Sequence, residues 1–160
     1  MLPNTIFLDL SNRYIVAMTR VLIVDDHHDS RTQIIDNLKA GNLLEVIGEA
    51  QTSDEALQLA EKLLPDIVLL DLHLPGLLTI PVLIQKLSAL RNVKVIAFAD
   101  ISKGAEVQDL LEAGAKGYIL KSDSSVLIRM SILMVARGSN DIISPALPRQ
   151  INRLTSQERT

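Results

Sequence analysis

Cysteine and tryptophan are absent from this sequence of 160 residues, and phenylalanine and tyrosine occur twice each. The absence of cysteine excludes disulfides, thiolate metal sites and thiol nucleophiles, and it is compatible with a reducing cytoplasm. A core with so few aromatic rings must be aliphatic, which favours parallel strands and helices over an aromatic-rich sandwich. The net charge of -3 creates no global field that would gather nucleic acid or an anionic membrane. No apolar run reaches the roughly 18 residues that span a bilayer, so we expect no membrane segment.

Short apolar runs alternate with amphipathic segments along most of the chain. The apolar runs predict five buried strands, at residues 20–25, 44–50, 66–72, 93–99 and 117–121. The segments after them predict five helices, from Asp29 or Ser30 to Gly41 and at 52–64, 80–90, 102–115 and 124–138. Because parallel neighbours need crossover helices, this order predicts a doubly wound α/β sheet covered on both faces. Ligands bind such sheets beyond the carboxyl ends of the strands.

The two ends of the chain differ in composition from the middle. Residues 1–19 lack a basic start followed by an unbroken apolar stretch, so they do not indicate a signal peptide, and Met18 could itself be the natural start. We interpret 1–19 as an N-terminal extension and 20–140 as the main domain. Residues 141–160 contain two prolines and few apolar anchors, which is typical of a linker into a further domain.

Three acids and a lysine follow the predicted strands at their carboxyl ends. Asp25 and Asp26 follow the first strand, Asp71 ends the third and Lys121 ends the fifth. Two carboxylates about 4 Å apart repel by about 4 kcal/mol at an effective dielectric near 20, so a positive group must lie among them. Mg²⁺ fits best, because it takes few protein oxygens and keeps its waters. Any one of these acids could be an ordinary solvated loop residue, but we reject that interpretation for all four residues together.

Asp71 is the predicted nucleophile of this cluster. With Mg²⁺ held by Asp26, Asp71 and the backbone carbonyl of His73, one oxygen of Asp71 stays free to attack phosphorus. Lys121 would supply the second positive charge on the phosphoryl oxygens. The residues themselves therefore predict phosphoryl transfer to an aspartate.

Three motifs, VLIVDDHHDSR, DIVLLDLHLPG and GAKGYILK, together resemble the receiver domain of bacterial two-component response regulators. The resemblance implies a flavodoxin-like fold, with a five-stranded parallel sheet in the order 2-1-3-4-5 and five helices. It implies Asp71 as phosphoacceptor, Asp25 and Asp26 as the acidic pair that binds Mg²⁺, Lys121 as the strand-five lysine and Tyr118 as the aromatic switch. It also implies a sensor histidine kinase as partner and a stoichiometric phosphoacceptor in place of an enzyme.

The sequence departs from the family pattern at two places. Ala99 stands where receivers carry Ser or Thr, and losing one charge-assisted hydrogen bond weakens a state by on the order of 1.5–3 kcal/mol. Leu78 and Thr79 stand where the family has an acid or amide and a glycine, which puts the geometry of that loop in doubt. Two interpretations stay open: a phosphoacceptor that switches weakly through Tyr118, or a phosphorylation-independent interaction module with a degenerate pocket. Tyr118 itself is either the switch or a half-buried ring with a solvated hydroxyl.

A phosphohydrolase is a third and weaker alternative. Many phosphohydrolases on doubly wound sheets carry a second aspartate two residues after the nucleophile, and here that position is His73. The predicted nucleophile also ends the third strand of the sheet, not the first. We therefore rank a catalytic phosphatase below a receiver.

The remaining motifs concern partners. The final segment RLTSQERT resembles the opening of a LuxR/FixJ-type helix-turn-helix, so DNA binding is expected only through a C-terminal domain missing from this chain. The predicted helix at 124–138 is apolar over a wide arc; such an arc usually reflects core packing, but its extent also favours a homodimer. His27, His28 and His73 invite a transition-metal or pH-sensing interpretation, but adjacent loop histidines are more often solvated, and we interpret them so.

Overall fold

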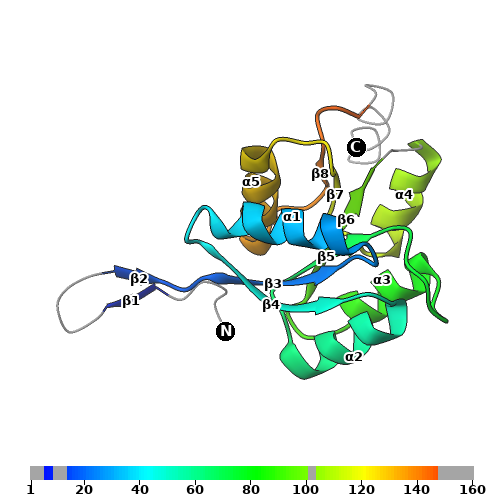
Figure 1. Cartoon of the computed structure of the whole chain (residues 1–160), viewed down its shortest axis with the longest axis horizontal. Helices are drawn as coiled ribbons and strands as arrows, with labels where there is room; N and C mark the ends of the chain where they lie inside the picture. Colours follow the sequence, from blue (N-terminus) through cyan, green and yellow to red (C-terminus); the bar gives the residue numbers. More distant parts are fainter. Residues whose placement is uncertain (1–5, 9–13, 101–103, 148–160) are drawn as a thin grey trace, which may run out of the picture.

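The computed structural model describes residues 6–8, 14–100 and 104–147 (Figure 1). In chain order its elements are β1 (Ile6–Leu8), β2 (Tyr14–Val16), β3 (Thr19–Val24), α1 (His28–Lys39), β4 (Leu44–Ala50), α2 (Ser53–Leu63), β5 (Ile67–Asp71), α3 (Ile80–Ser88), β6 (Lys94–Ala99), α4 (Gly104–Ala113), β7 (Gly117–Leu120), α5 (Ser125–Ala136) and β8 (Ile142–Ile143). The five predicted strands and five predicted helices are all present. Among the described residues, no helix is both long and apolar enough to cross a bilayer.

The main sheet is parallel throughout, with the order β4-β3-β5-β6-β7-β8. Its first five strands follow the predicted order 2-1-3-4-5, which is therefore confirmed. The sixth strand was not predicted: Ile142 pairs with Gly117 and Ile143 pairs with Tyr118. Part of the segment interpreted as linker thus extends the sheet, although the predicted domain boundaries stay a prediction.

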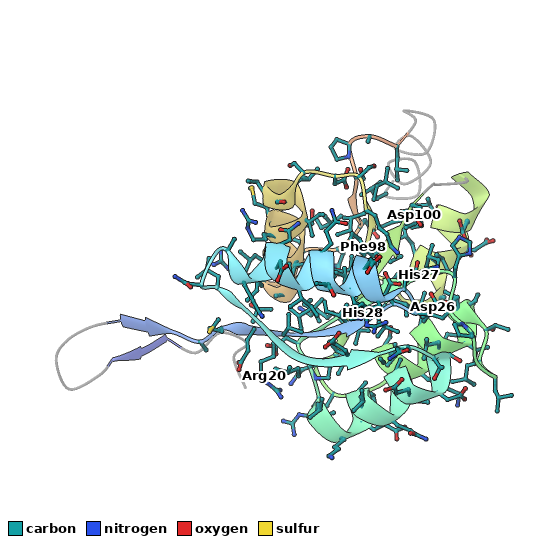
Figure 2. All side chains as sticks on the ribbon, in the orientation of Figure 1. Arg20, Asp26, His27, His28, Phe98 and Asp100 are labelled. Carbon is teal, nitrogen blue, oxygen red and sulfur yellow. The ribbon has the colours of Figure 1, made fainter. Side chains whose placement is uncertain are left out.

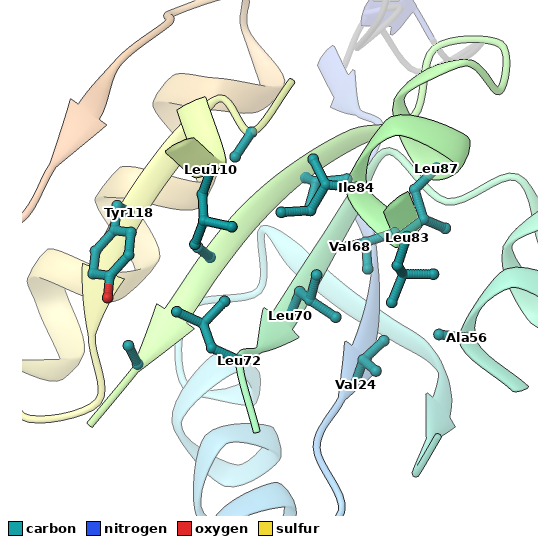
Figure 3. Close-up of a cluster of buried hydrophobic side chains, with 14 of the residues drawn as sticks. Val24, Ala56, Val68, Leu70, Leu72, Leu83, Ile84, Leu87, Leu110 and Tyr118 are labelled. Atoms are coloured by element: carbon teal, nitrogen blue, oxygen red, sulfur yellow. The ribbon is translucent and has the colours of Figure 1, made fainter. Parts of the chain in front are cut away.

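Alternate residues of each strand face opposite sides of the sheet, as the strand period requires. On one side, Leu22 and Val24 pack with residues of α2, α3 and α4. On the other side, Val21 and Ile23 pack with residues of α1 and α5. Figure 1 shows these helices covering the two faces, and Figure 3 shows the first cluster, in which Val24 lies among aliphatic side chains of neighbouring strands and helices. The core is almost entirely aliphatic, as the composition predicts.

The first helix begins earlier than the capping pattern predicts. Its N-cap residue is His27, whose side chain makes no capping hydrogen bond. The expected caps, Asp29 and Ser30, lie inside the helix, and the Ser30 hydroxyl donates to Asp25 Oδ2. The prediction was wrong here because the hydroxyl has a stronger, charged acceptor across the turn.

Two further expectations fall at the ends of the chain. β1 and β2 pair with each other in an antiparallel sheet that is separate from the main one, and Figure 1 shows them to one side of the domain. The resemblance to a helix-turn-helix opening falls in 153–160, which lies outside the described residues.

Candidate functional site

The carboxyl ends of neighbouring strands gather acidic side chains at one edge of the sheet. β3 ends just before Asp25 and Asp26, the adjacent β5 ends at Asp71, and β7 ends just before Lys121. One donor atom each from Asp25, Asp26, His27 and Asp71 lies within 4.8 Å of all the others. Figure 2 labels Asp26 and His27 beside the start of α1. The sheet therefore brings the predicted acids together, and it adds a histidine to them.

Asp25 is buried and fully hydrogen-bonded. Its Oδ2 accepts from Lys121 Nζ at 2.8 Å and from Ser30 Oγ at 2.5 Å, while its Oδ1 accepts from the backbone N–H of His27 at 2.9 Å. Burial alone would raise the pKa of Asp25, but the hydrogen bonds from Lys121, Ser30 and His27 lower it overall. Asp25 is thus an anion that the fold stabilises.

Lys121 connects the two buried acids. Its Nζ lies 2.8 Å from Asp25 Oδ2 and 3.4 Å from Asp71 Oδ1, and it donates to Ser30 Oγ at 3.2 Å. The ammonium also lies 5.8 Å from the centroid of the Phe98 ring, within the range of a cation–π contact. Burial would lower the pKa of Lys121, but Asp25 and Asp71 raise it overall, so the side chain stays cationic at neutral pH.

Asp71 is the least satisfied group of the site. Its side chain is 2% exposed, and neither of its oxygens has a hydrogen-bond partner. Burial and the charge of Asp25 raise its pKa, against the opposing effect of Lys121. Asp26 Oδ1 is likewise buried without a hydrogen-bond partner. Buried polar atoms are rarely left in this state, and oxygen atoms in a cluster of negative charge are the donors that Mg²⁺ takes, so the residues present fit that ion.

The two residues predicted to transmit a change lie on neighbouring strands but are not paired: Ala99 of β6 pairs with Leu120, and Tyr118 of β7 pairs with Ala97. Ala99 ends β6, is buried, and accepts a hydrogen bond from the backbone N–H of Lys121 through its carbonyl at 2.7 Å. Tyr118 is fully buried, and its hydroxyl donates to Glu106 Oε2 at 3.4 Å. Burial and the charge of Glu106 raise the pKa of Tyr118. The alternative of a half-buried ring with a solvated hydroxyl is therefore wrong; the role of Tyr118 as a switch stays a prediction.

The loop after β5 is held by the first turn of α2. The backbone N–H of Leu77 donates to Asp54 Oδ2 at 2.9 Å, and that of Leu78 donates to Ser53 Oγ at 3.2 Å. Gly76 has φ +135°, and a Cβ there would overlap Ser53 Oγ. The loop therefore has a defined conformation although residues 78 and 79 depart from the family pattern. The side chains of Ser53 and Asp54 in α2 hold its backbone, so a glycine is not needed at position 79.

The sequence analysis missed three members of the site. Ser30 was expected as a cap but lies between Asp25 and Lys121. Arg31 is buried and donates from Nη1 to the carbonyl of Asp25 at 2.9 Å, which fixes the turn after β3. Phe98 lies under the ammonium of Lys121. The only signal for the first two was their spacing, five and six residues after Asp25, which places the first turn of a helix against the end of the strand.

Comparison with known proteins agrees with this fold and with the three motifs. The family model for the response regulator receiver domain matches residues 21–132, so the chain belongs to that family. The first curated relatives include the transcriptional regulatory protein LiaR of Bacillus subtilis, 33% identical over 137 residues, a match that covers 86% of this chain and 65% of LiaR. The response regulator GacA of Pseudomonas viridiflava is 34% identical over 134 residues, covering 84% of this chain and 62% of GacA. The chain thus spans somewhat less than two thirds of the length of these relatives.

Solved structures give the same classification. The signal receiver domain of the response regulator NarL from Mycobacterium tuberculosis is 30% identical with a TM-score of 0.72, covering 76% of this chain and 98% of that one. A LuxR-family two-component response regulator from Aurantimonas is 26% identical with a TM-score of 0.74, covering 89% and 99%. The resemblance to receivers of the LuxR type is therefore confirmed.

Proposed function

We propose that Asp71 accepts a phosphoryl group from the phosphohistidine of a sensor histidine kinase, with Mg²⁺ held by Asp25, Asp26, Asp71 and the backbone carbonyl of His73. The main support is Asp71 itself: a buried carboxylate, without hydrogen-bond partners, beside a lysine and an acidic pair. The Asp71 carboxylate is destabilised until it binds a cation or is phosphorylated. The domain is a stoichiometric acceptor that controls an output domain.

The transfer is a displacement at phosphorus. One Oδ of Asp71 attacks, the bond from phosphorus to the histidine nitrogen breaks, and the departing imidazole keeps the electron pair and takes a proton from solvent. Bound Mg²⁺ would neutralise charge on the phosphoryl oxygens. The Lys121 ammonium, whose Nζ lies 3.4 Å from Asp71 Oδ1, would stabilise the negative charge on the same oxygens. Its raised pKa keeps the side chain charged.

The alanine at position 99 makes the domain an atypical receiver. Without a hydroxyl there, the phosphorylated state lacks one charge-assisted hydrogen bond, which costs on the order of 1.5–3 kcal/mol. Asp71 is then still phosphorylated. Compared with a receiver that carries Ser or Thr at position 99, the phosphoryl group favours the active state less and is lost from Asp71 in a shorter time. The alternative is a module that binds its partner without phosphorylation.

Intact-mass measurement after treatment with acetyl phosphate and Mg²⁺ tests the proposal. Wild type should gain one phosphoryl group, Asp71→Asn should gain none, and Ala99→Thr should lengthen the lifetime of the adduct. An unmodified wild type under saturating reagent would refute phosphorylation. In cells, Asp71→Asn should abolish output; full output from that variant supports the phosphorylation-independent module instead.

We also propose a homodimer formed through α5. Val126, Met130 and Met134 recur at intervals of four residues and are 57%, 54% and 43% exposed, which gives this helix one apolar outer stripe. Met130→Glu should shift the mass in light-scattering measurements from dimer to monomer. Leu77→Glu is the matched control, because Leu77 is 92% exposed but lies on the loop after β5. A monomeric wild type would end this part of the proposal.

The names of the relatives support a role in transcription. LiaR is described as a transcriptional regulatory protein, and the Aurantimonas protein as a LuxR-family response regulator. We propose that this chain acts in the cytoplasm and reaches DNA only through a C-terminal domain. A gel-shift titration with the present chain should show no sequence-specific complex, and a specific complex would contradict this assignment.

A further inference from the structure

A hydroxyl group lies between the buried acid Asp25 and the lysine of the site. Ser30, in the first turn of α1, donates its one hydroxyl proton to Asp25 Oδ2 at 2.5 Å. Because that proton is used, the Ser30 oxygen acts as acceptor in its contact with Lys121 Nζ, 3.2 Å away. Lys121 Nζ also donates to Asp25 Oδ2 at 2.8 Å. One carboxylate oxygen of Asp25 therefore has two donors, of which one is charged and one is neutral.

The charged donor also lies beside a second buried acid. Lys121 Nζ is 3.4 Å from Asp71 Oδ1, which is longer than a good hydrogen bond, and both oxygens of Asp71 are buried without a partner. A phosphoryl group on Asp71 would add negative charge next to the ammonium, which should then turn from Asp25 toward Asp71. Asp25 is 2% exposed, so bulk water cannot replace the hydrogen bond that its Oδ2 loses.

The neutral donor can stay in place while the ammonium turns away. Ser30 belongs to the first turn of α1, which the next residue fixes against β3, because Arg31 Nη1 donates to the carbonyl of Asp25 at 2.9 Å. The Ser30 hydroxyl thus keeps Asp25 Oδ2 hydrogen-bonded in both positions of the lysine. Without this hydroxyl, each turn of Lys121 toward Asp71 would leave a buried anionic oxygen unpaired, which is costlier than the loss of an ordinary hydrogen bond.

We propose that Ser30 is a positioning residue for phosphoryl transfer, because it holds Asp25 Oδ2 and thereby releases Lys121 for the phosphoryl group on Asp71. This inference rests on the proposed function, since the lysine has to turn only when Asp71 accepts that group. In transfer from acetyl phosphate, one Oδ of Asp71 attacks phosphorus, the bond from phosphorus to the acetate oxygen breaks, and acetate leaves with the electron pair. Ser30 forms no covalent bond in this step and transfers no proton.

Ser30→Thr and Ser30→Val form a matched pair, because the two new side chains have the same shape and only the first keeps a hydroxyl. Ser30 lines a cavity of about 480 Å³, together with Ile34 of α1 and Ile128 of α5, so an added methyl group has room. Valine also fills the space that a smaller residue would open to water, which could act as a substitute donor. Intact-mass measurement at timed intervals after mixing with acetyl phosphate and Mg²⁺ gives the rate of phosphoryl gain. Ser30→Val should lower this rate by about 5- to 30-fold, and Ser30→Thr should rescue it to within about twofold of wild type.

Mg²⁺ affinity, measured by calorimetric titration, separates positioning of the lysine from damage to the site. Loss of the hydroxyl leaves the carboxylates in place, so Ser30→Val should bind Mg²⁺ no more weakly than wild type. Equal rates of phosphoryl gain in the threonine and valine variants would overturn the proposal, and so would a valine variant whose Mg²⁺ affinity falls in proportion to its rate. If wild type itself gains no phosphoryl group, the proposed function fails and this inference fails with it, whereas a phosphorylated wild type with equal variants refutes the role of Ser30 alone.

Discussion

Replacing Asp71 with asparagine should make the metal-free protein more stable. The attraction between Asp71 and Lys121, 3.4 Å apart, amounts to about 5 kcal/mol at an effective dielectric of 20. Asp25 and Asp26 present oxygens within 4.8 Å of Asp71, so each repels it by about 3.5 kcal/mol or more on the same scale. Repulsion thus exceeds attraction by about 2 kcal/mol, before the cost of burying the charge. Solvent weakens the contribution of Asp26, which is 30% exposed.

We therefore expect Asp71→Asn to raise the free energy of unfolding at pH 7 by about 1–2 kcal/mol and the melting temperature by roughly 2–8 °C. The effect should depend on pH. The folded-state pKa of Asp71 is raised above its unfolded value, so the group stabilises the fold at acid pH, where it is protonated. Wild type loses that stabilisation as the pH rises through the folded-state pKa of Asp71. The free energy of unfolding of Asp71→Asn should therefore come to exceed that of wild type over the same pH range.

Urea unfolding at several pH values, with and without Mg²⁺, measures both effects. Mg²⁺ should stabilise wild type more than Asp71→Asn, because an ion stabilises the state whose ligands it binds. Asp36→Asn is the control, since Asp36 is an exposed acid on α1, and it should change neither stability nor the response to Mg²⁺. If Asp71→Asn is less stable than wild type at pH 7 without metal, Asp71 is not in a repulsive field and the electrostatic account of the site is wrong.

Three further substitutions test other parts of the structure. Lys121→Met removes the ammonium shared by two buried acids and should cost about 3–5 kcal/mol in urea unfolding at pH 7; a loss below about 1 kcal/mol would contradict the geometry of the pair. Ser144→Ala removes the 2.7 Å hydrogen bond to Asp123 Oδ1 and should cost about 1–3 kcal/mol, with faster hydrogen exchange in β8 while β3 is unchanged. Gly76→Ala should destabilise by about 1–3 kcal/mol and by more than Gly138→Ala, because both have positive φ but a Cβ at 138 meets no atom within 4 Å. Equal losses in the two glycine variants would show that the close approach to α2 does not matter.

Local sequence pattern was sufficient for the five main strands and not for the sixth. Ile142 and Ile143 form a run of only two residues after Asp141, whose φ is +54°, and Pro145 follows soon after. Nothing in so short a run distinguishes a strand from a linker. It is a strand because the edge of β7 offers partners: the N–H of Ile142 donates to the carbonyl of Lys116 at 3.1 Å, and that of Ser144 to the carbonyl of Tyr118 at 2.9 Å. This pairing depends on a neighbour, which periodicity cannot reveal.

The acidic cluster could be predicted because strand ends of a parallel sheet meet at one edge. Which side chains turn toward the acids could not be predicted in the same way. His27 was interpreted as solvated together with His28, and only the turn after β3 separates them, since it directs Nδ1 of the first toward Asp26. Side chains one residue apart at the start of a helix point about 100° apart, so a shift of one residue in the expected helix start changes which of them faces the site.

The side chain of Ala99, at the end of β6, carries no hydroxyl that could donate a hydrogen bond. β6 contacts the pocket through its backbone, where the Ala99 carbonyl accepts from the N–H of Lys121 at 2.7 Å, and through the Phe98 ring, whose centroid lies 5.8 Å from Lys121 Nζ. The other connection runs through the loop after β7, where Asp123 accepts from Leu120 N and from Ser144 Oγ. Neutralising Asp71 removes one of the two carboxylates that attract the Lys121 ammonium, and Lys121 lies two residues before Asp123. We therefore expect a charge change at the pocket to reach the segment that follows α5 through that loop, because Asp123 accepts hydrogen bonds from both Leu120 and Ser144.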